Sequence, residues 1–243
     1  MCSLLVIALS HVQPVMGYKK AYPIEQLPLF VMNKSVSWAA LWGFTIAMVP
    51  GILARMHRAW YRDSLLDKPT WLKNFLVCRK HLGLVSLWFL GVHMVMSTLM
   101  FSIAYYDRFF KDPEDPMSRM SANGESSFMF SSIAFNLYVL MGVCSLPCVA
   151  QAMTSKQWSF VYGPVAWTAL VFGTCHVMCQ GIGVTWQRAP WPNSGYLPPI
   201  TLIACLLPWL VMALKVFQVI FVWILDSSAK KKVAQNLSSE SEW

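Results

Sequence analysis

The chain has 243 residues, of which 56% are hydrophobic and only 12% are charged, about half the charged share of an ordinary soluble domain. A soluble protein of this length cannot build a core large enough to bury so much apolar sequence. The formal net charge is +8, but the basic residues gather in the segment 55–80 and in the tail, as they do beside the cytosolic ends of membrane helices. We therefore expect a membrane protein that contacts lipid and has no nucleic-acid partner.

The first apolar stretch is short. Residues 1–17 lack the basic start and the longer apolar core of a signal peptide. We interpret them as a truncated first helix or a weak signal, followed by an outer loop at 18–35. We expect the membrane domain proper to occupy 36–225 and a disordered cytosolic tail to occupy 226–243, because that tail is polar.

Long runs without a charged residue dominate the rest of the chain. A helix needs about 20 apolar residues to cross a bilayer, and each of these runs is that long. They are 35–54, 82–106, 126–155, 157–187 and 189–225, the last of them interrupted only by Lys215. We predict an all-α membrane protein, a bundle of five complete transmembrane helices plus the short or truncated first helix.

Charge in the connecting segments predicts the orientation. The basic segment 55–80 should lie in the cytosol, which places the mixed, slightly acidic loop 107–125 outside. The sequon Asn33-Lys34-Ser35 then also falls outside, where glycosylation of Asn33 is expected to be possible.

Two histidines lie deep in the predicted spans. His93 is on the third helix and His176 is on the fifth. One reversed helix separates them, so their helices run in parallel, and their distances from the cytosolic ends place both in the outer half of the bilayer. Two facing imidazoles are the usual ligands of a low-spin haem. The alternative is two unrelated buried histidines that bond to backbone carbonyls.

A further histidine raises the question of a second haem. His81 precedes His93 by 12 positions on the same helix, as in cytochromes that stack two haems. The matching position on the fifth helix, near 162, holds Tyr162 instead of histidine. We therefore expect one haem, held between the third and fifth helices.

Basic residues mark the cytosolic start of the third helix. Arg79, Lys80 and His81 form a candidate site for a phosphate or another anion. The alternative is an anchor whose side chains extend to lipid headgroups. Lys215, in the last span, allows the same two interpretations.

Several stretches carry a family pattern in a constant order and spacing. They are Pro69-Thr70-Trp71-Leu72, Arg79-Lys80-His81-Leu82-Gly83-Leu84 with His93 downstream, Val143-Cys144-Ser145-Leu146-Pro147, Gly173-Thr174-Cys175-His176, and Leu207-Pro208 with Lys215. In these stretches, over roughly residues 36 to 225, the chain resembles the STEAP metalloreductases (six-transmembrane epithelial antigen of the prostate).

The resemblance implies a function. Such proteins have six membrane helices, assemble as trimers, and hold one haem b and one FAD. They pass electrons from NADPH to ferric or cupric ions outside. His93 and His176 match the haem ligands of that family. The tentative FAD or phosphate contacts are Arg79, Lys80, His81, Ser145, Lys156 and Lys215.

The chain departs from the family pattern at three places. A Gly-x-Gly occurs only at Gly181-Ile182-Gly183, at the end of a membrane helix and without the strand context of a dinucleotide site, so we expect no NADPH site in this chain. The inner loop has Ser155 and Lys156 followed by Tyr162-Gly163-Pro164 where the family has its flavin pattern. The second serine of the family's Ser-Leu-Pro-Ser stretch is Cys148 in this chain. The first helix, finally, is short or missing.

We therefore expect a transmembrane haem b electron-transfer protein that reduces Fe(III) or Cu(II). It would act as an enzyme only with a partner that oxidises NADPH, in a homo- or heterotrimer of STEAP-like subunits in the plasma or endosomal membrane. The alternative is a non-catalytic haem-binding scaffold that modulates trimeric metalloreductase partners.

Overall fold

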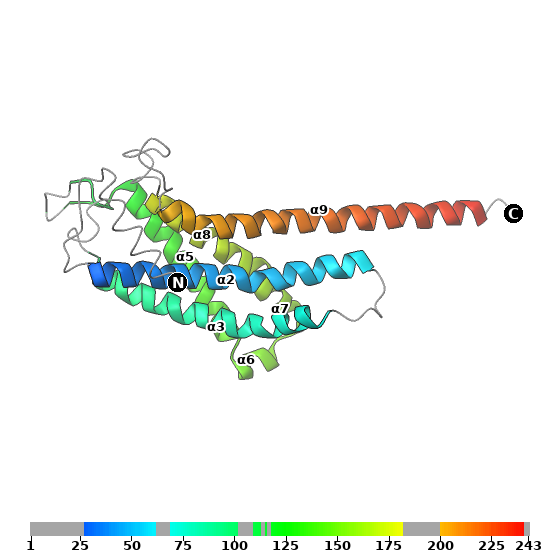
Figure 1. The fold of residues 1–243 in the computed structure, drawn as a ribbon, viewed down its shortest axis with the longest axis horizontal. Helices are drawn as coiled ribbons and strands as arrows, with labels where there is room; N and C mark the ends of the chain where they lie inside the picture. The colour runs from blue at the N-terminus through cyan, green and yellow to red at the C-terminus, as the bar shows by residue number, and fades with distance from the viewer. Residues whose placement is uncertain are drawn as a thin grey trace.

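The computed structural model describes residues 27–61, 69–101, 109–112, 115, 118–181 and 200–240. These residues form helices and no strand, apart from one isolated bridge between Phe110 and Met120 (Figure 1). The helices are α2 (Leu27–Tyr61), α3 (Thr70–Leu99), α5 (Ala122–Cys144), α6 (Pro147–Ala152), α7 (Ser155–Phe160), the π-helix η3 (Val161–Val165), α8 (Ala166–Gly181) and α9 (Ile200–Glu240).

Five helical stretches of the described chain are long and apolar enough to cross a membrane. They are Val31–Tyr61, Thr70–Leu99, Ala122–Cys144, Ser155–Gly181 and Thr201–Ser228. The prediction of an all-α, multi-pass membrane protein with five complete spans is therefore confirmed. The short first segment predicted at 1–17 lies outside the described residues.

The ends of two helices differ from the expected boundaries. α2 begins at Leu27, inside the stretch expected to be an outer loop. α9 continues to Glu240, through most of the stretch expected to be a disordered tail. A run of alanine, lysine and glutamine follows residue 228. These are good helix formers, so a helix continues there although the sequence is polar.

The spans associate mainly as two antiparallel pairs. α2 packs extensively along α3, and α5 packs extensively along α8, whereas contacts between the two pairs are sparse. α9 lies against α2 and α8 and projects beyond the bundle (Figure 1). α3 and α8 run in the same direction, as the alternation of spans predicted.

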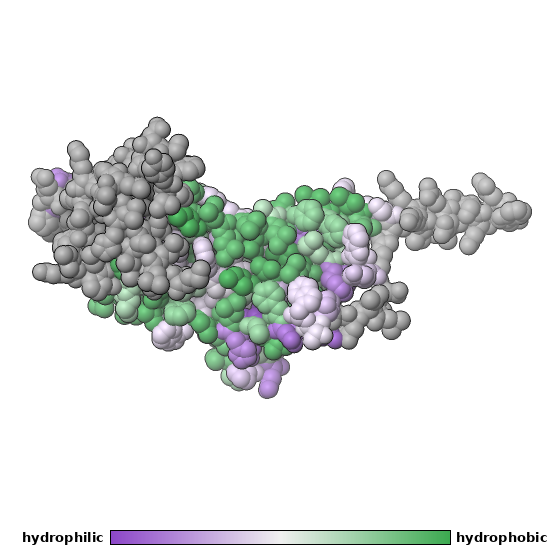
Figure 2. Space-filling view, in the orientation of Figure 1, coloured by the Kyte–Doolittle hydropathy of each residue, from purple (hydrophilic) through white to green (hydrophobic). Residues whose placement is uncertain are grey.

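Apolar side chains cover both the inside and the outside of this bundle. Ile52, Leu170 and Val211 are among those buried in the core, while Trp88 and Leu210 are each 65% exposed on the helix surfaces. Hydrophobic residues cover most of the visible face between the grey regions (Figure 2). A helical surface of this kind suits a bilayer, because the lipid acyl chains that would surround it are also apolar.

Small residues allow the helices to cross closely. A Cβ atom added to Gly43 on α2 would lie 2.5 Å from the Ser86 hydroxyl of α3. Small residues at helix crossings are typical of membrane proteins. The hydroxyl of Ser86 donates to the carbonyl of Leu82 one turn earlier, at 2.7 Å, so this polar group is satisfied inside its own helix.

A π-turn separates α7 from α8. η3 contains Pro164, which has no N–H to donate to the helical ladder. The wider turn of the π-helix accommodates that missing hydrogen bond. Single π-turns of this kind in other helices often lie beside functional sites. Tyr162, on this turn, lines a cavity described below.

Candidate functional site

A cavity of about 460 Å³ lies between the two helix pairs, and both predicted ligand histidines line it. We call it the histidine cavity. His93 lies about two turns before the C-terminal end of α3, and His176 lies about one and a half turns before the end of α8. The structure therefore places the two histidines near the same end of the bundle, with one cavity between them. Its volume falls within the range of about 300–1,000 Å³ typical of sites for small molecules and cofactors.

Hydrogen bonds tie His93 to the neighbouring helix. Its Nδ1 lies 2.6 Å from Oδ1 of Asn33 on α2, and Nδ2 of the same amide donates to the Ser97 hydroxyl at 3.1 Å. An amide oxygen only accepts, so Nδ1 of His93 carries the proton and Nε2 keeps a lone pair. Metal-binding histidines show this arrangement, in which the second nitrogen is held by a hydrogen-bond acceptor.

His176 has the same tautomer for a similar reason. Its Nδ1 lies 2.9 Å from the backbone carbonyl oxygen of Ser127 on α5, so Nδ1 donates and Nε2 carries the lone pair. Nε2 of Gln180, one turn along α8, lies 3.0 Å from that lone pair. The Lys34 ammonium donates to Oε1 of Gln180 at 3.4 Å. Gln180 therefore links the second histidine to a cation.

The residues around the histidine cavity fit a haem. Two imidazoles from different helices each keep a lone pair on Nε2, and much of the wall is aromatic or aliphatic. Gly173 contributes a stretch of wall without a side chain, and Lys34 supplies a positive charge suited to a carboxylate. No group of three or more histidine, cysteine or acidic residues is placed for a metal ion among the described residues.

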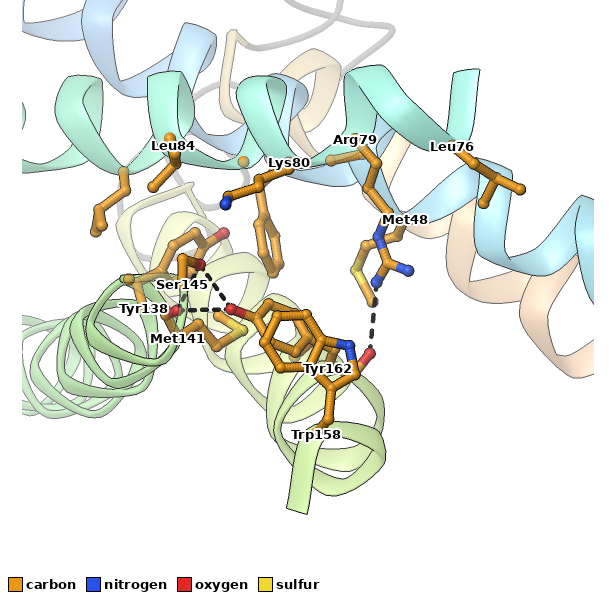
Figure 3. Close-up of a pocket in the computed structure, with 16 residues that line it drawn as sticks. Met48, Leu76, Arg79, Lys80, Leu84, Tyr138, Met141, Ser145, Trp158 and Tyr162 are labelled. Atoms are coloured by element: carbon orange, nitrogen blue, oxygen red, sulfur yellow. Dashed lines mark hydrogen bonds between the residues drawn. The ribbon is translucent and has the colours of Figure 1, made fainter. Parts of the chain in front are cut away.

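A second cavity of about 270 Å³ lies toward the other end of the bundle. We call it the arginine cavity. Arg79 and Lys80 of α3 lie on one side of it, facing Ser145 and Tyr162 (Figure 3). No acidic residue is among the described residues that line it. The cavity is therefore positive and suits an anion.

Hydrogen bonds and ring contacts position Tyr162 in this wall. Its hydroxyl donates to the carbonyl of Met141 at 3.0 Å and lies 2.6 Å from the Ser145 hydroxyl. Its carbonyl accepts from Nη2 of Arg79 at 3.5 Å, and its ring lies 4.2 Å from that of Trp158, centroid to centroid. The tyrosine at the position considered for a fourth haem ligand thus belongs to a network that joins three helices.

The structure separates the six tentative FAD or phosphate contacts. Arg79, Lys80 and Ser145 line the arginine cavity. His81 and Lys156 are exposed and do not line it. Lys215 donates to Oε1 of Gln218 at 2.7 Å and lies over the Trp167 ring at 5.7 Å. Their role as cofactor contacts stays a prediction.

Sequence reasoning missed the side chains that hold the histidines. Asn33 was interpreted as an outward glycosylation sequon, but it is 1% exposed and bonded to His93. That expectation is wrong for this fold, because a glycan on Nδ2 would have no room at this buried site and would displace the bond from Nδ2 to the Ser97 hydroxyl. Ser127 and Gln180 gave no motif. The spacing of Gln180 one helical turn after His176 was the only available signal.

Comparisons with known proteins agree with the motifs. The chain is 27% identical to human metalloreductase STEAP2 over 203 residues, which cover 79% of the chain and 41% of that protein. It is 28% identical to rat metalloreductase STEAP3 over 202 residues, which cover 78% of the chain and 41% of that protein. The matches support membership of the STEAP metalloreductase family. The family resemblance inferred from the motifs is thus confirmed.

The matches cover only part of each STEAP protein. This chain spans about two fifths of the length of the STEAP proteins it matches. No protein-family model matches it. The matches and the five spans together support a metalloreductase-type membrane domain in a multi-pass membrane protein.

Proposed function

We propose that this chain is a transmembrane haem b electron-transfer protein of the metalloreductase type, which passes electrons outward to Fe(III) or Cu(II). The observation that carries the proposal is the histidine cavity, which His93 and His176 both line with Nδ1 as the donor and Nε2 unprotonated. A haem held there would supply reversible one-electron transfer. Two protein ligands would leave no open position on the iron, which would favour electron transfer over oxygen binding.

The roles of the protein side chains follow from their contacts. His93 and His176 would ligate the iron from opposite helix pairs. Asn33 and Ser127 accept the Nδ1 protons, which would leave Nε2 of each ring for iron. Lys34 lines the cavity, where it would pair with a carboxylate of the group. Much of the remaining wall is aliphatic or aromatic.

We further propose that the arginine cavity receives FAD or part of it. Its two cations suit phosphate, and the rings of Trp158 and Tyr162 suit a flat aromatic group. Tyr138 lines both this cavity and the histidine cavity, so a group in either one would approach the other across that ring. Electrons would come from an NADPH-oxidising subunit in a homo- or heterotrimer of STEAP-like chains in the plasma or endosomal membrane.

An absorption spectrum of the purified protein tests the haem proposal. The wild type should show a low-spin b-type spectrum that disappears in a His93→Ala/His176→Ala double variant. His57→Ala is the matched control, since the His57 ring lies 4.6 Å from that of Tyr61 near the end of α2 and outside the histidine cavity, and it should leave the spectrum unchanged. A wild type without haem, or a double variant that keeps the spectrum, would refute the proposal.

A non-catalytic haem-binding scaffold that modulates trimeric partners is the second candidate. The dispersal of the six tentative FAD contacts favours it, because only three of them line the arginine cavity. Ferric and cupric reduction by cells that express a competent partner separates the two functions. A reduction rate above that of cells with the partner alone, abolished by the double variant, supports electron transfer. An unchanged reduction rate supports the scaffold.

A further inference from the structure

Among the described residues, the bond between Asn33 and His93 is the shortest polar contact at the histidine cavity. It joins α2 to α3 across 60 positions of sequence at 2.6 Å. Asn33 is 1% exposed, and an amide at such a site is costly unless its polar atoms are paired. The pairing is therefore specific, and it acts on a nitrogen of a proposed iron ligand.

We propose that Asn33 is the positioning residue of His93, and this inference rests on the proposed haem function. Oδ1 of Asn33 accepts the Nδ1 proton of His93, which fixes the tautomer and the plane of the ring. Nε2 then carries its lone pair into the cavity. An acceptor on Nδ1 also makes the imidazole a stronger electron donor through Nε2.

Ser97 contacts both ends of the Asn33 amide. Its hydroxyl accepts from Nδ2 at 3.1 Å and lies 3.4 Å from Oδ1, a longer contact than the 2.6 Å between Oδ1 and His93. The same hydroxyl lies 3.4 Å from Nδ1 of His93, a longer contact than that of Asn33. Ser97 therefore supports the amide, and Asn33 makes the main contact.

The two histidines differ in what holds them. Nδ1 of His176 donates to the backbone carbonyl of Ser127 at 2.9 Å, and the hydroxyl of the same serine lies 3.0 Å from this nitrogen. His93 donates to a side chain, so its acceptor is open to substitution. Asn33 is thus a residue through which the sequence would set the donor strength of one proposed iron ligand without changing the ligand itself.

The test replaces Asn33 with leucine, which has a similar size and no acceptor. In purified Asn33→Leu, we expect haem affinity to fall by about 10–100-fold, as for other residues that orient metal ligands. We expect the midpoint potential to shift upward, because the weaker donor stabilises the ferric state less. Haem titration gives the affinity, and spectroelectrochemical titration gives the potential.

Two further variants make the result decisive. Asn136→Leu is the matched control, since Asn136 is exposed on α5 and donates to the carbonyl of Ser132. It should leave both quantities at their wild-type values. Ser97→Ala should shift the potential in the same direction as Asn33→Leu and by less. If Asn33→Leu does not fold, Ser97→Ala decides the question by the same two measurements.

The outcomes separate this inference from the proposed function. A wild type that binds no haem overturns both. A wild type with a bis-histidine spectrum, together with wild-type affinity and potential in Asn33→Leu, overturns the role of Asn33 alone. A loss of thermal stability without a change in potential also overturns it, because that is the result expected of a merely structural hydrogen bond.

Discussion

Substituting Gln180 with leucine should tighten haem binding. The amide of Gln180 donates to Nε2 of His176 at 3.0 Å, the nitrogen that we propose as an iron ligand. Any metal bound there must first displace this amide. A hydrogen bond of this kind contributes about 0.5–1.5 kcal/mol, and 1.4 kcal/mol is a tenfold change in affinity, so the leucine variant should bind about two- to tenfold more tightly.

The assay is a titration of haem into the haem-free protein in detergent, followed by the absorbance of the bound form. Gln151→Leu is the matched control, because Gln151 is exposed on α6 and lines neither cavity. It should bind haem as the wild type does. Unchanged or weaker binding by Gln180→Leu would refute the reasoning and would show that the amide does not compete with iron for this nitrogen.

Three further predictions follow from the packing and the polar contacts. Gly43→Ala should lower the melting temperature, at a cost of about 1–3 kcal/mol, because its Cβ would meet the Ser86 hydroxyl; adding Ser86→Ala should restore it. Protein made in a secretory system should carry no glycan on Asn33, because this amide is buried. Glycosidase treatment should therefore remove nothing from this position and cause no change in gel mobility through it. Tyr162→His should leave one haem per chain, since His81 is exposed outside the arginine cavity; a second haem, measured by pyridine haemochrome, would contradict this.

The spans and the two histidines could be predicted because their signals are local. A long run without charges indicates a membrane span independently of the rest of the chain. Burying a histidine in such a run is energetically costly wherever its helix packs. Alternation of the spans then gave the parallel direction of α3 and α8. The start of α2 at Leu27 was missed because charge-free length was used as the boundary, and Lys34 lies inside the helix.

The contacts around the histidines could not be predicted, because they connect distant positions. Asn33 is 60 residues from His93, and Ser127 is 49 from His176. Which positions meet depends on how two helices are rotated about their axes, and a charge pattern does not fix that rotation.

The basic cluster illustrates the same limit on a single helix. Successive residues of a helix point about 100° apart, so three consecutive side chains cannot all face one space. Arg79 and Lys80 line the arginine cavity, whereas His81 is exposed. Lys156 was matched by sequence position alone, and it lies exposed on α7.

The division of the bundle into two closely packed pairs has a consequence for assembly. Each pair carries one histidine, and each histidine is fastened to the other member of its own pair, while contacts between the pairs are sparse. Between the pairs lie the shared apolar core and α9. A group bound by both imidazoles would add a direct cross-link between the two pairs.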